Sequence, residues 1–350
     1  MDRVTGEWEF EIEFIVSMIQ IVNYSPKYEE AHFKFASLMF GPRRKRRNSD
    51  YIYWKFRGVE GVEMPSLKLA VSDGEVVGQL GVIPCKVRLG HEIIDAQWAC
   101  DLMVRKNYRG KGIAAGLYEN AHAQKILTIG SNPSPSAEKS MLRNRYNRIP
   151  GPQKYFIPYH LGTPLRMKGI NVNLLNRTRN PFLSLFQKKD AASFFAELDV
   201  TVEQMNNVFG YDNLSEASSV FVDKDFLQWR YLGFKDYYPG IKLYKMKEAE
   251  TYFSGYFMGG TYFITDLKLA EARHITKIIS FILEMGKGMS WHGIKFLNNE
   301  RVLHFPFLKP VAIKYRTDTV IIYHTENIRI KEEMEQRYFY YTLRDSDENI

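Results

Sequence analysis

Alternation of hydrophobic and polar positions marks the N-terminal part of the chain as β-rich. Residues 7–14, Glu-Trp-Glu-Phe-Glu-Ile-Glu-Phe, alternate strictly, which is typical of a strand with one buried and one solvated face. Apolar runs at 67–71, 76–83 and 87–94 predict three strands of a meander, and 125–130 predicts a later strand. Between the first strand and the meander, Ser25 followed by Pro26 predicts the start of a helix.

One segment combines a strand, a glycine-rich turn and a helix. The run 96–104 is apolar apart from Asp101 and predicts a strand, while 113–123 predicts a helix. The turn between them ends in Arg109-Gly110-Lys111-Gly112. Glycines at a helix N-terminus let backbone N–H groups approach an anion, and the helix dipole favours negative charge there. The segment therefore predicts a phosphate-binding loop.

Two common phosphate loops do not fit this segment. A Walker loop needs Ser or Thr after its Gly-Lys step, whereas Gly112 is followed by Ile113. A dinucleotide fingerprint, Gly110-x-Gly112-x-x-Ala115, matches only formally. Five residues separate it from the strand, and position 130 is Gly rather than the acid that would bind a ribose.

The chain also repeats itself. Asp50-Tyr-Ile-Tyr-Trp54-Lys-Phe56 returns as Asp225-Phe-Leu-Gln-Trp229-Arg-Tyr231, and Cys100-Asp101-Leu102 returns as Thr265-Asp266-Leu267. Three further short matches occur in the same order with similar spacing, at 39–41 and 208–210, 77–80 and 254–257, and 129–132 and 296–299. Five matches in register predict two copies of one α/β unit.

Composition narrows the class of protein. The chain has 350 residues, of which 45% are hydrophobic, so two packed domains are expected. The formal net charge of +8 favours anionic partners. Two cysteines predict neither a disulfide framework nor a zinc site. Because no apolar stretch is long enough to span a membrane and no secretory signal is evident, we predict a cytoplasmic protein.

The segment 101–114 resembles the pyrophosphate loop of the GNAT superfamily of acyl-CoA-dependent N-acyltransferases. Arg109, Gly112 and Ala114 occupy the fixed places of the family pattern Arg/Gln-x-x-Gly-x-Gly/Ala. The resemblance implies an α/β (α+β) fold of two tandem GNAT-like lobes, each a mixed, mostly antiparallel sheet flanked by helices. We expect an acyl-CoA-binding lobe at 1–165, a connector at 166–194, a second lobe at 195–325 and a tail at 326–350.

The same resemblance implies a binding site for acetyl-CoA or another acyl-CoA as cosubstrate, without a metal. The backbone N–H groups of Gly110, Lys111, Gly112, Ile113 and Ala114 would hold the pyrophosphate, and Arg109 and Lys111 would meet the phosphates. The main chain of Leu102, Met103 and Val104 would pair with the pantetheine arm. In the second copy, the corresponding residues 273–278 contain no glycine, so that copy is expected to be degenerate.

Catalytic residues are less clearly indicated. Many family members have a Glu where this chain has Cys100, so Asp101 is the nearest carboxylate that could act as general base. However, Asp266 repeats Asp101 in the copy without the loop, which favours a structural role for both. The remaining candidates for the base are Tyr24, Glu60, His91 and Glu92. Met141 stands where the family general acid, a Tyr, is expected.

We therefore predict an acyl-CoA-dependent N-acyltransferase, most simply one that acetylates a primary amine of a small molecule. An amino sugar of a bacterial surface polysaccharide is the first acceptor considered, by analogy alone. The alternatives are an aminoacyl-tRNA- or protein-directed transferase and a non-enzymatic acyl-CoA sensor. Nucleic acid is a permitted but less favoured partner, because the basic run Arg43–Arg47 is more simply a solvated loop. The sequence does not define an oligomeric state.

Overall fold

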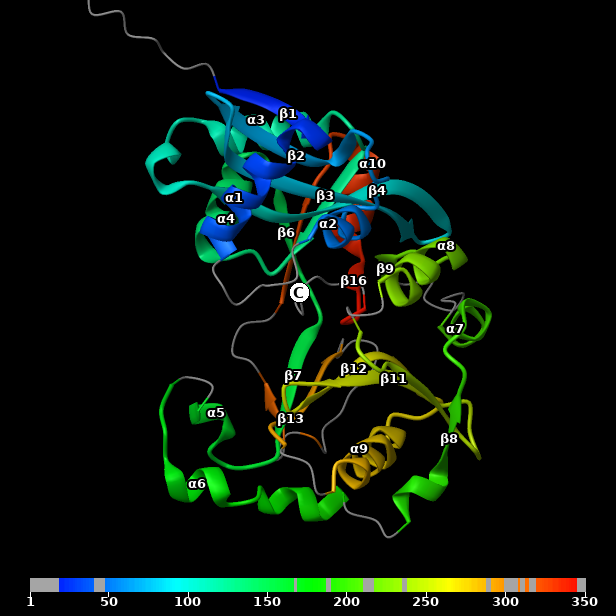
Figure 1. Ribbon diagram of the computed structural model, residues 1–350. Helices are drawn as coiled ribbons and strands as arrows, with labels where there is room; N and C mark the ends of the chain where they lie inside the picture. Colours follow the sequence, from blue (N-terminus) through cyan, green and yellow to red (C-terminus); the bar gives the residue numbers. More distant parts are fainter. Residues whose placement is uncertain are drawn as a thin grey trace, which may run out of the picture.

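The computed structural model describes residues 19–40, 48–166, 169–186, 190–209, 217–234, 238–287, 291–298, 308, 312–314 and 319–344. These residues form two mixed β-sheets, one above the other in the view of Figure 1, with helices packed against them. The predicted α/β fold of two sheet-and-helix lobes is confirmed. The strand predicted at 7–14 and the basic run at 43–47 lie outside the described residues.

The first sheet contains most of the predicted meander. Its main path runs in the order β1 (Gln20–Tyr24), β2 (Met64–Ser72), β3 (Glu75–Leu89), β4 (Glu92–Val104), β5 (Leu127–Ser131), β15 (Val320–His324) and β6 (Asn147–Pro150). Neighbours along this path are antiparallel except for β4 and β5. β9 (Ala217–Val220) pairs with the far end of β3, and β16 (Tyr338–Tyr340) pairs with β9.

Helices cover both faces of this sheet. On one face lie α1 (Glu29–Phe40) and α2 (Ser49–Lys55), which pack on the side chains of Leu67, Leu69 and other members of the largest core cluster. On the other face lie α3 (Ile113–His122) and α4 (Pro135–Arg143), which form a separate core cluster with residues that include Ala70. Alternate residues of β2 therefore point into different cores, as the two-residue period of a strand requires.

The second sheet repeats this plan. Its order is β14 (Ile313–Lys314), β7 (Gln153–Pro158), β13 (Gly293–Asn298), β12 (Thr261–Lys268), β11 (Tyr252–Met258), β10 (Lys242–Met246) and β8 (Phe195–Leu198). As with β4 and β5, the pair β12 and β13 is parallel. The helix α9 (His274–Met285) packs on the sheet through Ile275, Ile278, Ile279 and Ile282, none of which is exposed.

Strands are exchanged between the two sheets, and β9 and β16 of the first sheet also come from the second half of the chain. β7 follows β6 directly in the chain but pairs with β13 in the second sheet. β15 comes from the second half of the chain but lies between β5 and β6 in the first sheet. The sheets therefore differ from a division into consecutive lobes at 1–165 and 195–325, because each lobe fills a vacant strand position in the other.

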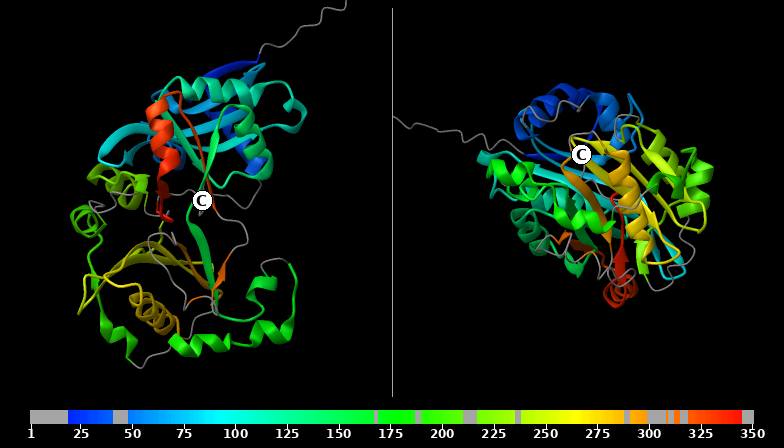
Figure 2. Two further views of the ribbon diagram at one scale, coloured as in Figure 1. Left: turned by 180° about the vertical axis from the view of Figure 1, so that it is seen from behind. Right: turned by 90° about the horizontal axis from the view of Figure 1, so that it is seen from below.

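The predicted connector and tail also contain regular structure. The connector region has α5 (Thr163–Arg166), α6 (Asn173–Arg177) and the 3-10 helices η3 (Pro181–Phe186) and η4 (Ala191–Phe194). After β15 the chain forms α10 (Ile328–Gln336), seen beside the first sheet in the rear view of Figure 2. Phe339, Tyr341 and Leu343 near the end are buried in the largest core cluster. The described part of the tail thus contributes side chains to the core.

The repeated tryptophans connect the two copies. Trp54, at the end of α2, donates its indole N–H to the carbonyl of Trp229 at 2.8 Å. Trp229, in the π-helix η5 (Gln228–Leu232), which continues α8 (Lys224–Leu227), donates in return to the carbonyl of Trp54 at 2.6 Å. Their rings pack with centroids 5.9 Å apart. Reciprocal contacts between equivalent residues are what a two-fold relation between the copies produces.

The segment 87–94 differs from its prediction as a single strand. That prediction is wrong, because the chain turns there between β3 and β4, with Gly90 at a φ of +60°. Glycine adopts this backbone conformation without the cost that a Cβ imposes. Across the described residues, no helix has the length and apolar character that crossing a membrane requires.

Candidate functional site

A cleft opens where β4 and β5 separate. The two strands pair only over Ala96–Trp98 and Leu127–Ile129, although β4 continues to Val104 and β5 to Ser131. Among the described strands, none pairs with β4 beyond Trp98 on this side. A ligand that offers amides in an extended line would pair with this backbone, as an added strand does.

A β-bulge lies on β4 inside this cleft. Gly81 of β3 pairs with Cys100, and Gln79 pairs with Met103, so Asp101 and Leu102 face Leu80 alone. Asp101 has a φ of +51°, an uncommon value for a residue with a side chain. Bulges redirect the backbone and side chains next to them and are frequent beside binding sites.

The loop after β4 ends in two glycines with left-handed backbone. Gly110 has φ +82° and Gly112 has φ +79°, and Gly112 is the N-cap residue of α3. A Cβ added at either position would meet no atom within 4 Å, so the glycines leave open space beside the start of the helix. Because the first N–H groups of a helix have no partner within the helix, this space is suited to an anion.

The basic residues around the loop lie in different environments. Arg109 donates from Nε to the carbonyl of Val104 at 3.1 Å, which holds the loop against the end of β4. Lys111 lies over the ring of Tyr108, with 5.0 Å between Nζ and the ring centroid. Arg105 pairs with Glu75 at 2.6 Å and is therefore partly neutralised. Arg109 and Lys111 make no ion pair with a described residue, so their charge is available to an anion at the loop.

Two adjoining cavities occupy the cleft. The larger, of about 790 Å³, runs from the backbone of β4 past the glycine loop to α4. The predicted residues that line it are Leu102, Met103, Val104, Arg109, Gly110, Gly112, Ile113 and Ala114. The smaller, of about 380 Å³, extends between β4 and β5 and includes Asp101 and Met141 in its lining. Of the predicted cofactor-binding residues, only Lys111 lines neither cavity.

The sequence prediction missed the wall that α4 contributes. This wall consists of Ser134, Ser136, Ala137, Ser140, Arg143 and Asn144. Ser134 caps the helix by accepting from the amide of Ala137 at 3.3 Å, and Pro135 is its first residue. The pair Ser134-Pro135 after a predicted strand was the signal that could have located this helix start. Small side chains along α4 keep the cleft wide, while Arg143 adds a positive charge at its end.

Asp101 is held by a buried lysine. Nζ of Lys55 donates to Oδ2 of Asp101 at 2.8 Å, with side-chain exposures of 1% and 11%. Gln79 donates to the Asp101 carbonyl at 3.3 Å, and its side-chain carbonyl lies 3.0 Å from Nε2 of His32. These contacts fix the bulge from the α1 and α2 side of the sheet. A carboxylate that is already neutralised by a lysine is a weak proton acceptor.

None of the alternative bases reaches the cavities. Tyr24, Glu60, His91 and Glu92 are absent from both linings. The hydroxyl of Tyr24 donates to Glu29 at 3.2 Å, and burial raises the pKa of this hydroxyl well above its usual value. Glu92 lies at the opposite end of β4 from the bulge, where Arg329 lowers the pKa of its carboxyl. Met141, the residue found in place of the expected acid, is buried on α4.

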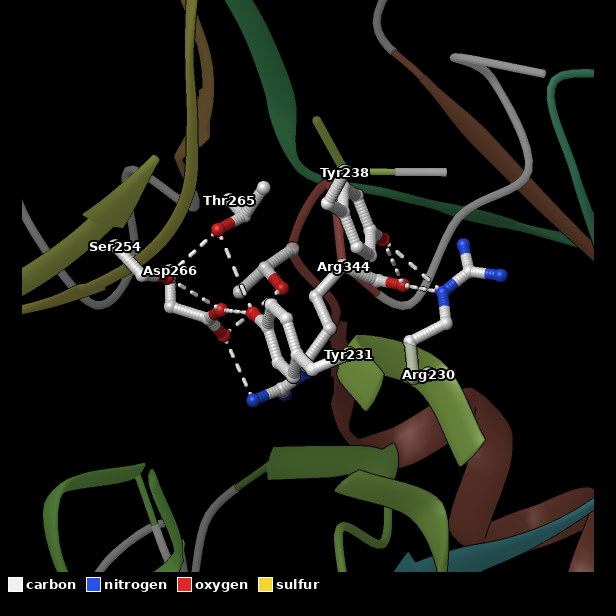
Figure 3. A network of polar contacts seen from close by, with 8 residues as sticks. Arg230, Tyr231, Tyr238, Ser254, Thr265, Asp266 and Arg344 are labelled. Atoms are coloured by element: carbon white, nitrogen blue, oxygen red, sulfur yellow. Dashed lines mark hydrogen bonds and ion pairs between the residues drawn. The ribbon is translucent and has the colours of Figure 1, made fainter. Parts of the chain in front are cut away.

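Asp266, the counterpart of Asp101, is enclosed more completely. Figure 3 shows it at the centre of a polar network near the end of the chain. Oδ1 lies 2.7 Å from Nη1 of Arg344, both side chains are fully buried, and Ser254 donates to Oδ2 at 2.9 Å. The hydroxyl of Tyr231 also donates to Oδ2. The amide of Arg344 donates to the carbonyl of Thr265 at 3.4 Å, so the chain end lies against β12.

Part of the sequence is similar to a known protein family. Residues 18–125 match the family model described as an acetyltransferase (GNAT) domain. A search of curated proteins gives no match. Among the described residues, no group of three or more His, Cys, Asp or Glu side chains is arranged to hold a metal ion.

Solved structures match most of the chain. A GCN5-related N-acetyltransferase from Kribbella flavida has a TM-score of 0.58 at 10% identity, over 88% of this chain and 71% of that chain. One from Anabaena variabilis has a TM-score of 0.56 at 11% identity, over 89% and 74%. N-myristoyltransferase from Saccharomyces cerevisiae, solved with bound myristoyl-CoA and inhibitors, has a TM-score of 0.58 at 11% identity, over 89% and 80%. Residues 18–125 are thus similar to the GNAT acetyltransferase domain, and the chain as a whole has the fold of these structures, with two lobes.

Proposed function

We propose that this protein is an acyl-CoA-dependent N-acyltransferase that acetylates a primary amine of a small molecule. The observation that carries the proposal is the continuity of the cleft. The open edge of β4, a left-handed glycine loop and the start of α3 all line one cavity. This arrangement offers amide partners to an extended arm and N–H donors to an anion at the end of that arm, which are the two chemical features of CoA.

Each part of the cleft has its own role in this function. The backbone N–H groups of residues 110–114 hold the pyrophosphate, assisted by the charges of Arg109 and Lys111 and by Arg143 across the cavity. The main chain of Leu102, Met103 and Val104 pairs with the pantetheine amides. Backbone donors exposed at the bulge stabilise the oxyanion that forms when an amine attacks the thioester. Bound acyl-CoA supplies the activated acyl group.

The acceptor amine enters where the smaller cavity meets the face that carries α1. Phe40, Cys100, Asp101 and Asn132 line the cavity there. Asp101 remains the candidate general base, but its ion pair with Lys55 supports a positioning role on the bulge. A thiolate leaves without an acid more readily than an alkoxide, because a thiol has a pKa of about 8.5. Met141 at the expected acid position is therefore compatible with turnover.

Thioester turnover tests the proposal. Purified protein is mixed with acetyl-CoA and a panel of amines that includes amino sugars, and the released thiol is measured. We expect turnover with at least one small primary amine. Myristoyl-CoA belongs in the same panel, because one of the similar folds was solved with that molecule bound. Tight CoA binding without turnover on any amine, peptide or aminoacyl-tRNA would instead indicate a sensor.

A further inference from the structure

The connector region carries an unusual surface at the end of the molecule remote from α3. It is formed by α5, α6 and η3, which lie along the outer edge of the second lobe in Figure 1 and Figure 2. Large apolar side chains are exposed on it: Leu161 at 37%, Ile170 at 51%, Leu174 at 77%, Phe182 at 47% and Leu185 at 69%. We call these residues, together with the exposed Arg166, Arg177 and Arg179, the basic apolar rim.

The helix η3 shows that the exposure is built into the fold. A 3-10 helix has three residues per turn, so residues i and i+3 share a face. Leu183 and Phe186 point inward and are buried at 0% and 4% in the core of the second lobe. Phe182 and Leu185, on another face, remain in solvent. The hydroxyl of Ser280 on α9 donates to the carbonyl of Phe186, which fixes the orientation of η3.

The rest of the rim is also fixed to the fold. The amides of Leu161 and Gly162 donate to the carbonyls of Thr178 and Leu175 at 3.0 and 2.9 Å, which ties α5 to α6. The side chain of Asn180 donates to the carbonyl of Pro158, the last residue of β7, at 3.1 Å. The exposed Ile170 and Leu174 therefore project from an anchored scaffold. Several large apolar side chains that neighbouring, anchored elements leave exposed are typical of an interaction site.

The charge of the segment is equally one-sided. No Asp or Glu occurs between Glu138 and Asp190. Residues 161–189 contain six basic residues, Arg166, Lys168, Arg177, Arg179, Lys188 and Lys189. These account for most of the formal net charge of +8 of the whole chain. A surface that combines apolar and basic side chains and lacks acidic ones is complementary to a partner with negative charge at its surface and apolar groups below that surface.

We propose that the basic apolar rim binds the surface of an anionic lipid bilayer, with the protein attached peripherally. Leu174, Leu185 and Phe182 enter the boundary between headgroups and acyl chains, while the arginines pair with lipid phosphates. Exposed aliphatic side chains favour a bilayer over RNA, since RNA-binding surfaces combine basic residues with aromatic rings that stack on bases. The inference stands independently of the proposed acyl transfer and requires no membrane-spanning helix.

Vesicle co-sedimentation of the full chain tests this inference. The vesicles are phosphatidylcholine alone and phosphatidylcholine mixed with phosphatidylglycerol. We expect binding to the anionic vesicles only, weakened by salt. Two double variants, Leu174→Ser with Leu185→Ser and Arg166→Glu with Arg177→Glu, should each reduce affinity by about tenfold or more. Thermal unfolding and CoA binding should stay close to wild type, because the changed side chains are exposed and far from the cleft.

Matched controls change exposed aliphatic and basic residues elsewhere on the surface. Val59→Ser with Val62→Ser removes two apolar side chains that are 67% and 53% exposed, and Lys224→Glu with Lys331→Glu reverses two exposed charges. Both controls should bind anionic vesicles as the wild type does. Failure of the wild type to bind, or equal loss in rim and control variants, would overturn the proposal. The proposal would also be overturned if the protein self-associates, the rim variants abolish this self-association, and no vesicle binding is found. In that case the rim would bind a second copy of the chain.

Discussion

The two lobes share a parallel strand pair that opens after three residues, but they use the opening differently. In the first lobe β4 leaves β5 after Trp98, and the gap is a cavity that leads to two left-handed glycines. In the second lobe β12 leaves β13 after Phe263, and residues near the chain end lie against β12. There Arg273 precedes α9 with a right-handed φ of −64°, and His274 is buried.

This difference indicates what each copy of the unit retains. Both copies keep an Asp beside a register irregularity in the meander and a cation that neutralises it. Only the first keeps bare backbone at a helix start. We therefore expect the fold to depend on the paired Asp and the proposed anion binding to depend on the glycines. Variants that separate these two roles test the comparison directly.

The largest expected difference concerns stoichiometry. We predict one acetyl-CoA per chain, because the start of α9 offers side chains where α3 offers backbone N–H groups. Each charge-assisted hydrogen bond lost is worth about 1.5–3 kcal/mol, so two losses weaken binding by orders of magnitude. Calorimetric titration of the full chain measures the number of sites. Two sites of equal affinity would contradict the assignment of the cleft to the first lobe alone.

Gly112→Asp should abolish CoA binding while the fold survives. The new carboxylate would lie at the approach of the pyrophosphate and would repel it. Gly240→Asp is the matched control, because Gly240 also has a positive φ, +65°, and a Cβ added there would meet no atom within 4 Å. The control bears the same backbone cost without the phosphate site. CoA affinity and circular dichroism are measured for both, and equal affinities would remove the phosphate-loop assignment.

Replacing the two paired aspartates should cost stability, and more so in the second lobe. Asp266→Asn leaves Arg344 buried with a neutral partner, a kind of change that typically costs about 3–5 kcal/mol. Asp101→Asn should cost less, because the Asp101 side chain is 11% exposed whereas that of Asp266 is fully buried. Denaturant unfolding gives both free energies. Lys55→Met combined with Asp101→Asn should recover part of the loss, because it removes the buried lysine that the single variant leaves without its carboxylate.

The same Asp101→Asn variant also tests whether Asp101 acts as the general base. If its stability matches wild type while most of the turnover is lost, Asp101 acts as the general base and the positioning role is wrong. If stability falls and the folded fraction retains its turnover, the ion pair with Lys55 holds the bulge in position. A pH–rate profile adds a readout that a structural role alone would not change.

A smaller, pH-dependent effect is expected where an exchanged strand enters the first lobe. The rings of His122 on α3 and His324 on β15 stack with centroids 3.5 Å apart. Burial, followed by the charge of His324, lowers the pKa of His122 to about 4. Burial likewise lowers the pKa of His324, against the opposing effect of Glu326. Both imidazoles are therefore neutral in the folded protein at neutral pH.

These lowered pKa values make the folded protein less stable at acidic pH. Below the ordinary histidine pKa of about 6.5, the unfolded chain takes up protons that the folded chain does not, so stability falls as the pH falls toward 4. His122→Gln should flatten this dependence of the unfolding free energy on pH. His91→Gln, at the exposed turn between β3 and β4, is the control and should leave the slope unchanged. Equal slopes in wild type and His122→Gln would exclude the histidine pair as its cause.

Much of the fold could be predicted from the local pattern of the sequence. The strand ending at Val104, the helix beginning at Ile113 and the fifth strand all follow from periodicity and glycine placement, and the structure places them within a few residues. The tryptophans of the repeat are core residues, as their recurrence predicts: Trp54 belongs to the largest core cluster and Trp229 packs against it. The glycine loop and the open end of β4 meet in one cavity because they are adjacent in sequence.

Features that depend on contacts between residues far apart in the sequence could not be predicted in this way. Nothing local to Gln153–Pro158 or Val320–His324 indicates that these strands change sheets, since the alternation of a strand is the same in either partner. The ion pair of Lys55 with Asp101 joins a helix to a bulge 46 residues later. The wall of α4 becomes part of the cleft only when the strand order is known. Tertiary pairing, rather than propensity, decides each of these.

The strand exchange also constrains the order in which this chain can be completed during synthesis. The first sheet needs β15, which begins at Val320, before β5 and β6 are joined. While the ribosome makes the intervening residues, the edges of β5 and β6 are exposed to unwanted pairing. The contacts that close the sheet span nearly two hundred residues of chain, and such long-range closure is slow. We therefore expect completion of the first lobe to be one of the last events of folding, after the second lobe has emerged.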